Sequence, residues 1–208
     1  AVSRIINYFQ FPDISNANED GLLAMGGDLE VDTLVSAYAQ GIFPWYSEGQ
    51  PILWWSPNPR MVLYPSEVKL SRSLKRTLRK SNMTVSCNRC FEQVISACAL
   101  RGQAPTFDND PEATWITQEM NAAYIDLHKL GYAHSIEVWQ NEELVGGLYG
   151  LALGSAFFGE SMFSRVSDAS KVALVSLCNA LAAQKYTLID CQVASDHLFT
   201  LGAVEIPR

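Results

Sequence analysis

The chain has 208 residues, of which 48% are hydrophobic, and this is enough to bury a core in one domain or in a large domain with a smaller lobe. Its net charge of −7 excludes a general attraction to nucleic acid, unless positive charge gathers in one place. No stretch approaches the roughly 20 apolar residues of a membrane span, and the amino terminus has no basic-then-apolar signal arrangement. We therefore expect a cytoplasmic protein that does not enter a membrane.

The sequence before residue 80 is rich in aromatic residues, prolines and turns, and it contains one clear helical pattern. Asp32 or Thr33 is expected to cap a helix over residues 34–40, and Gly41 is expected to end it.

After residue 80, helical and extended patterns alternate. Thr117 and Asp168 are expected to cap helices, and residues 141–142 and Gly154 to form turns. Three strands in succession with short turns predict an antiparallel meander, so we expect a mixed α/β domain. The expected strands are 83–87, Ala133–Gln140, Glu143–Leu153, 155–161 and 187–193, and the expected helices are 91–100, 117–130 and 169–184.

The five cysteines are odd in number and follow no regular framework. They are typical of buried thiols in a reducing compartment. Cys87 and Cys90 have the spacing of half a zinc site, but no second pair of Cys or His follows at a suitable distance. We therefore expect no metal.

Half of the residues in the segment 69–80 are Lys or Arg, and none is acidic. Spacings of three and four place these side chains on a broad helical face, with Leu74 and Leu78 turned toward the body of the protein. Phosphates are the natural partners of such a face, although a merely solvated helix has the same pattern. Because the rest of the chain is acidic, this concentration of charge favours RNA binding. The basic residues are Lys69, Arg72, Lys75, Arg76, Arg79 and Lys80.

Tryptophans cluster on two predicted loops, with Trp45, Trp54 and Trp55 close together and Trp115 just before a helix cap. A partly exposed tryptophan can stack on an adenine ring. The alternative is that these tryptophans pack together as an aromatic cluster. We expect at least one of them to be a stacking platform.

Residues 143–165 combine glycines with apolar side chains. Glycine inside a strand allows a bulge or the close approach of a ligand to the backbone. Glu160 lies among aromatic residues in this run, so we expect it to be buried with a partner. That partner is either Arg165 or Lys171, or a cationic group of a substrate.

Asp190 and Gln192 lie two residues apart in an otherwise apolar strand, so regular alternation places them on the same face. A buried acid can act as a base, and an amide can hold a nucleophile or stabilise a developing oxyanion. A hydrogen-bonded pair that fixes strand register is the alternative. Cys191 is expected to point away, and no serine has the context of a nucleophile, so covalent catalysis is disfavoured.

These motifs resemble, in the same order, those of the bacterial leucyl/phenylalanyl-tRNA–protein transferases, and the resemblance covers residues 21–208. The matching motifs include GLLAMGGDL at 21–29, AHSIEVW at 133–139 and IDCQ at 189–192. The resemblance implies a mixed α/β fold, with a small amino-terminal domain over residues 1–65 and an N-acetyltransferase-like acyltransferase domain over residues 66–208. It implies no bound cofactor. Residues 102–113 are expected to form a longer and more acidic loop than the family pattern has.

The resemblance also implies an activity, the transfer of Leu or Phe from Leu-tRNA or Phe-tRNA to proteins that begin with Arg or Lys. This transfer marks the acceptors for degradation in the N-degron pathway, and we expect a monomer. By position, Asp190 and Gln192 match the pair that acts in peptide-bond formation, and Glu160 lies in the substrate region. The basic segment, residues 69–80, matches one that is expected to touch the acceptor stem, with Arg72, Lys75, Arg76, Arg79 and Lys80 as the tRNA-binding residues. Trp45 and Trp115 match residues that hold the terminal adenosine of the tRNA. The residues that match the lining of the amino-acid pocket are Leu148, Met162, Leu177 and Leu181.

Two other functions compete with this one. A CoA-dependent N-acetyltransferase would need a glycine-rich turn at the start of a helix for the pyrophosphate, and residues 165–170 contain no glycine. A non-catalytic tRNA-binding module would use the basic segment and the tryptophans, but it would leave Asp190 and Gln192 without a purpose.

Overall fold

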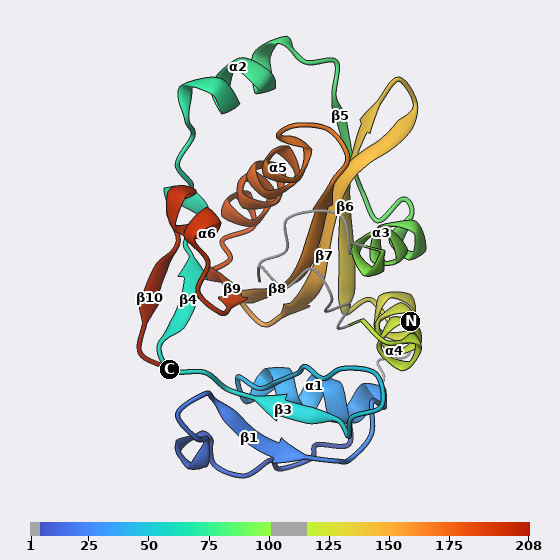
Figure 1. Cartoon of the computed structure of the whole chain (residues 1–208), viewed down its shortest axis with the longest axis vertical. Coiled ribbons are helices and arrows are strands. Elements are labelled where there is room, and N and C mark those ends of the chain that lie inside the picture. Colours follow the sequence, from blue (N-terminus) through green and yellow to red (C-terminus); the bar gives the residue numbers. More distant parts are fainter. Residues whose placement is uncertain (1–4, 101–115) are drawn as a thin grey trace.

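The computed structural model describes residues 5–100 and 116–208, and its amino-terminal part is a small antiparallel sheet covered by one helix. Strand β3 (Leu53–Trp55) lies between β1 (Leu22–Met25) and β2 (Phe43–Pro44). Helix α1 (Val31–Ala39) packs beside them at one end of the molecule (Figure 1). Trp54 fills the core of this unit, and its indole N–H donates to the carbonyl of Gly26 at 2.8 Å.

A seven-stranded sheet forms the larger part, in the order β10-β4-β9-β8-β7-β6-β5. Its neighbouring strands are antiparallel except for the parallel pair β8 and β9. The strands are β4 (Arg60–Leu63), β5 (Thr84–Cys87), β6 (Ala133–Gln140), β7 (Glu143–Leu153), β8 (Ala156–Ser164), β9 (Leu188–Gln192) and β10 (Val204–Ile206).

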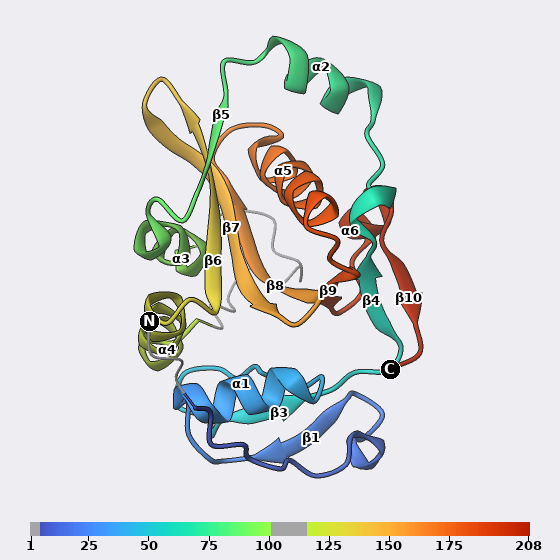
Figure 2. The same ribbon diagram turned by 180° about the vertical axis from the view of Figure 1, so that it is seen from behind.

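Helices cover both faces of this sheet (Figures 1 and 2). One face packs against α5, and the other packs against α3 and α4. The apolar cluster beneath α3 and α4 continues into the amino-terminal domain, so the two domains share a core. The helices are α2 (Arg72–Lys80), α3 (Phe91–Ala99), α4 (Gln118–Lys129), α5 (Ala169–Ala183) and α6 (Asp196–Thr200), with the 3-10 turns η1 (Ile14–Asn16) and η2 (Pro65–Glu67).

The elements expected after residue 80 are confirmed to within a few residues, including the meander of β6, β7 and β8. Thr117 caps α4, because its hydroxyl accepts a hydrogen bond from the N–H of Met120 at 3.1 Å. The turn between β6 and β7 places Asn141 and Glu142 at positive φ, as a tight hairpin requires. The mixed α/β class with a small amino-terminal domain is therefore confirmed.

Two expected helix caps are wrong. Helix α1 begins at Val31, earlier than expected, and neither Asp32 nor Thr33 is its cap. Instead, the carboxylate of Asp28 accepts from the N–H of Glu30 at 3.0 Å and from the hydroxyl of Thr33 at 2.7 Å. Asp168 occupies the N-cap position of α5, as expected. Its side chain, however, accepts a hydrogen bond from the hydroxyl of Thr77 on α2 and makes no capping hydrogen bond to α5.

The strand glycines serve packing within the protein. A Cβ on Gly146 would lie 2.5 Å from the Cβ of Ala169, so this glycine lets α5 approach the sheet. A Cβ on Gly150 would lie 2.1 Å from the carbonyl oxygen of Phe158, in the neighbouring strand. These two positions need no ligand to explain them.

The expected domain boundary between residues 65 and 66 stays a prediction, although β4 lies before it and already belongs to the larger sheet. Among the residues that the structure describes, no helix is both long and apolar enough to cross a bilayer.

Candidate active site

Two irregularities in the large sheet bring Glu160 and Gln192 together. Along β7 and β8, Tyr149 faces Ser161 and the next residue, Gly150, faces Gly159, so Glu160 has no residue opposite it. Such a bulge redirects a side chain out of the regular alternation. Gln192 has φ +68°, a left-handed conformation at the end of β9. As a result, the side-chain amide Nε2 of Gln192 donates to Oε1 of Glu160 at 2.9 Å.

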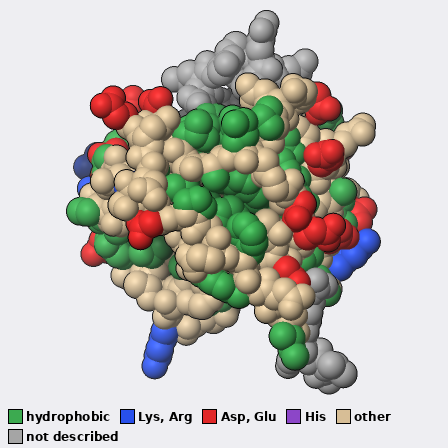
Figure 3. All heavy atoms as spheres, turned by 90° about the horizontal axis from the view of Figure 1, so that it is seen from below, with side chains coloured by type: hydrophobic (Ala, Val, Ile, Leu, Met, Phe, Trp, Pro, Cys, Tyr) green, Lys and Arg blue, Asp and Glu red, His purple; other side chains and the backbone are tan. Residues whose placement is uncertain are grey.

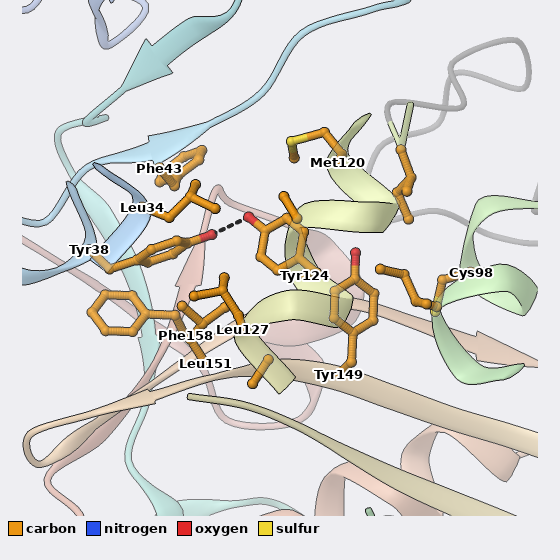
Figure 4. Close-up of a cluster of buried hydrophobic side chains, with 14 of the residues drawn as sticks. Leu34, Tyr38, Phe43, Cys98, Met120, Tyr124, Leu127, Tyr149, Leu151 and Phe158 are labelled. Carbon is orange, nitrogen blue, oxygen red and sulfur yellow. Dashed lines mark hydrogen bonds between the residues drawn. The ribbon is translucent and has the colours of Figure 1, made fainter. Parts of the chain in front are cut away.

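Glu160 is a buried carboxyl group, 5% exposed, that is surrounded by neutral donors. The hydroxyl of Tyr38 on α1 also donates to its Oε1. The Tyr38 and Tyr124 hydroxyl oxygens lie 2.5 Å apart and share a hydrogen bond (Figure 4). Of the two alternatives for its partner, pairing with Arg165 or Lys171 is wrong, because Arg165 contacts the carbonyl of Leu144 and Lys171 the carboxylate of Asp168.

Burial raises the pKa of Glu160, and the hydrogen bonds from Tyr38 and Gln192 lower it. Burial is the larger effect, so the pKa rises from its ordinary value of 4.5 to about 7. Burial also raises the pKa of both tyrosine hydroxyls well above 10, and the neighbouring Glu160 raises them further. The tyrosines therefore stay protonated near neutral pH, whereas Glu160 can take up or release a proton there.

Asp190 has a cationic partner, which the sequence did not predict. Arg60 on β4 donates through Nε to Oδ1 at 3.0 Å, and its Nη2 lies 2.9 Å from Oδ2. Oδ1 also accepts the backbone N–H of Gln192 at 2.8 Å. Asp190 and Gln192 are therefore both buried and adjacent, as expected, but the left-handed backbone of Gln192 replaces regular alternation.

Cys191 lies between these two residues, and burial raises the pKa of its thiol strongly, which disfavours the thiolate that a nucleophilic cysteine needs.

Four residues predicted to line an amino-acid pocket come together in the apolar cluster between the sheet and α5. Leu148 on β7 faces Met162 on β8 directly across the strands, and Leu177 and Leu181 lie on α5. All four are buried. Their proximity is confirmed, and their role as a pocket stays a prediction.

The tryptophans differ in burial. Trp54 is packed in the core, whereas Trp45 and Trp55 are half-buried, with ring centroids 5.7 Å apart. The indole N–H of Trp55 donates to the carbonyl of Trp45 at 2.7 Å, which fixes the Trp45 backbone. Trp115 and the loop 102–113 lie outside the described residues. Adenosine stacking on Trp45 stays a prediction.

The basic helix α2 stands at the end of the molecule opposite the amino-terminal domain (Figures 1 and 2). Leu74 is 1% exposed and anchors it, as expected, but Leu78 is 38% exposed, so the expectation that it faces the body is wrong. Within residues 5–100 and 116–208, no ion pair links a basic side chain of this helix to a carboxylate. The exposed basic residues are Arg72, Lys75, Arg76, Arg79 and Lys80, and Lys69 just before the helix is exposed as well.

Three residues of the site were missed by sequence reasoning. Tyr38 and Tyr124 occupy the apolar faces of their helices, where a tyrosine normally means core packing. Arg60 begins the apolar run of β4, and a charged residue at the edge of a buried strand was the one available signal.

Comparison with known proteins identifies the family. The family model described as "Leucyl/phenylalanyl-tRNA protein transferase" matches residues 62–208. The family model for the amino-terminal domain of the same transferase matches residues 27–58. The chain belongs to the leucyl/phenylalanyl-tRNA–protein transferase family.

Relatives of the same name include the transferase of Syntrophus aciditrophicus, which is 58% identical over 95% of this chain and 81% of that protein. The transferase of Cellvibrio japonicus is 56% identical over 96% of this chain and 83% of that protein, and the one of Syntrophobacter fumaroxidans is 54% identical over 100% of this chain and 86% of that protein. Among solved structures, a GCN5-related N-acetyltransferase from Kribbella flavida matches with a TM-score of 0.43 and 12% identity, over 81% of this chain and 58% of that one. A likeness this distant does not establish the fold family of the larger domain, so its acetyltransferase-like description stays a prediction.

Proposed function

We propose that this protein transfers a leucyl or phenylalanyl group from tRNA to the amino terminus of another protein. Membership of the transferase family carries this proposal, since the family descriptions match both domains. The buried contact between Glu160 and Gln192 supports it, because the reaction needs a group that holds an amine and a group that accepts a proton.

The reaction joins an amine to an activated ester. The α-amine of the acceptor protein attacks the ester carbonyl carbon, a new C–N bond forms, and the C–O bond to the terminal ribose breaks. One proton must leave the attacking nitrogen, and the ribose oxygen must gain one. An α-amine with a pKa of about 8 needs only a modest base, so a covalent enzyme intermediate is not required.

Gln192 and Glu160 divide these tasks in our proposal. The side-chain nitrogen of Gln192 donates to Glu160, and its side-chain oxygen is the group that accepts a hydrogen bond from the attacking amine. Glu160 lies one hydrogen bond away and takes the proton, then returns it to the ribose oxygen. Asp190, to which the sequence assigned this base role, has both oxygens engaged by Arg60.

The partners follow from the same family assignment. The exposed cations of α2 contact the phosphates of the acceptor stem, and Trp45 and Trp115 hold the terminal adenosine. The aminoacyl side chain enters beside Leu148, Met162, Leu177 and Leu181. Acceptors begin with Arg or Lys and are marked for degradation, and the protein acts as a monomer in the cytoplasm, where aminoacyl-tRNA is made.

One assay separates this proposal from its two rivals. The protein is mixed with radiolabelled Leu-tRNA and a peptide that begins with Arg, with acetyl-CoA and the same peptide in a parallel tube. Label in the peptide supports the transferase. Retention of labelled tRNA without transfer would favour a binding module, and acetylation of the peptide would favour an acetyltransferase.

A further inference from the structure

Arg60 is a buried cation that connects the two domains at the site. Its side chain leaves β4, the strand next to β9, and its guanidinium forms a two-pronged contact with Asp190. Arg60 as a whole is 6% exposed. A charge in such a position is destabilising unless it is paired and hydrogen-bonded, so Arg60 and Asp190 depend on each other.

The other side of the guanidinium reaches into the amino-terminal domain. Nη1 donates to the carbonyl of Gly41 at 2.9 Å, and it lies 3.4 Å from the hydroxyl oxygen of Ser56. The ring of Phe43 lies 5.1 Å from Cζ, within the range of a cation–π contact. Gly41 follows the carboxyl end of α1, where the helix dipole favours a cation.

Asp190 passes this constraint on to Gln192. The same Oδ1 that faces Arg60 Nε accepts the backbone N–H of Gln192. A residue other than glycine at φ +68° is strained, and the surrounding structure must hold it there. The contacts of Asp190 supply that restraint at the residue whose side chain contacts Glu160.

We infer that Arg60 is a positioning residue for aminoacyl transfer, which acts by fixing Asp190 and, through it, the backbone of Gln192. This inference rests on the proposed function. It makes the amino-terminal domain part of the active site, because Gly41, Phe43 and Ser56 hold the guanidinium in place. It also assigns to Asp190 a structural partnership in place of proton transfer.

Steady-state transfer kinetics of the Arg60→Lys, Arg60→Met, Asp190→Asn and Arg60→Met/Asp190→Asn variants test this inference. We expect kcat to fall roughly 100-fold in each single variant, the loss typical of a misplaced reacting group, with KM for Leu-tRNA within about threefold of the wild type. The double variant should be no slower than the worse single variant, because both changes break the same contact.

Multiplied effects in the double variant would show that Asp190 works independently of Arg60 and would overturn the inference. A kcat within about threefold of the wild type in Arg60→Lys and Arg60→Met, or a loss confined to KM, would overturn it as well. Arg89→Met is the matched control, because Arg89 also lies over an aromatic ring, that of Trp139, but contacts no residue of the site.

Thermal unfolding of each variant shows whether it is folded. If Arg60→Met does not fold, Arg60→Lys, which keeps the charge, provides the test. The wild-type enzyme distinguishes a failure of the proposed function from a failure of this inference. If it transfers no label, the proposed function fails; if it transfers label and the Arg60 variants match it, only this inference fails.

Discussion

Glu160 and Asp190 are two buried carboxyl groups in one site with different kinds of partner. Asp190 faces the guanidinium of Arg60, whereas Glu160 accepts hydrogen bonds from the neutral side chains of Tyr38 and Gln192. Environments that differ in this way separate the roles of two acids within one site. In our proposal, proton transfer therefore falls to Glu160, and Asp190 serves as an anchor.

The transfer rate should depend on the ionisation of Glu160. Because its pKa is about 7, the wild-type kcat should rise as pH increases through 7, where the carboxyl group becomes able to accept a proton. Glu160→Gln should lose this step and be slower by a factor on the order of 100 or more. The measurement is a pH–rate profile with one acceptor peptide, so that titration of its amine is common to both enzymes. An unchanged step near pH 7 in Glu160→Gln would assign it to another group.

The same carboxyl group should affect stability. Its pKa is higher in the folded protein, about 7, than the ordinary 4.5, so between these values the folded state binds more protons than the unfolded state. The stabilising contribution is therefore complete below pH 4.5 and is lost as pH rises to about 7, by roughly 3 kcal/mol at about 1.4 kcal/mol per pKa unit.

Urea unfolding at pH 5 and pH 7.5 measures this effect as a difference between the wild type and Glu160→Gln. The stability of the variant relative to the wild type should increase over this range. A constant difference would contradict the burial of an ionisable Glu160.

At the scale of elements, the bulge in β8 and the glycine beside it determine where Glu160 points. Gly150 begins the irregular step in the pairing of β7 and β8, and no side chain fits there, since its Cβ would overlap the carbonyl of Phe158. Gly159, opposite it, would make only contacts of 3.7 Å or longer through a Cβ.

Gly150→Ala should therefore destabilise the protein by about 1–3 kcal/mol or more, whereas Gly159→Ala should change the free energy of unfolding much less. Urea denaturation of the two variants measures this. Equal effects would mean that the two strands can move apart at little cost.

Helix α2 supplies a prediction for RNA binding. Its exposed cations have no acidic partners among the described residues. A phosphate that binds them therefore breaks no ion pair and releases only bound counterions. Replacing Lys75, Arg76 and Arg79 by Gln should weaken tRNA binding and reduce the slope of log K against log salt by about one per residue removed. Filter binding over a range of salt concentrations tests this, with Arg89→Gln as a control outside the helix. An unchanged slope would exclude α2 from the contact.

Sequence reasoning succeeded at this scale where the signal is local. The cap at Thr117 and the hairpin at Asn141 depend on neighbours a few residues away. It failed where pairing is distant, since the contact of Arg60 with Asp190 joins residues 130 positions apart. The bulge at Glu160 and the left-handed Gln192 also depend on neighbouring strands, so no periodic pattern reveals them.

In the whole molecule, charge is divided between the two ends. Residues 5–59 contain no Lys or Arg but seven Asp and Glu, whereas α2 at the other end is basic. Seen from below, the end formed by the amino-terminal domain carries hydrophobic side chains near its centre and acidic ones around them, with Lys and Arg only at the margin (Figure 3). Such a field repels phosphates at one end and attracts them at the other, and we propose that it orients an approaching tRNA.

The site lies where the two domains meet. Tyr38 of α1 reaches Glu160, and Arg60 joins the carbonyl of Gly41 to Asp190. Glu160 and Asp190, the two carboxyl groups of the site, are therefore each in contact with a group tied to the amino-terminal domain, which gives a physical reason for the small domain to accompany the larger one in this family.

The central claim is that the Gln192 side chain, held by Glu160, orients the attacking amine. Single-turnover transfer from radiolabelled Leu-tRNA to a peptide that begins with Arg, measured for Gln192→Ala beside the wild type, tests it most directly. We predict a transfer rate lower by roughly 100-fold or more in the variant, with tRNA binding unchanged. A rate within a few-fold of the wild type would contradict it.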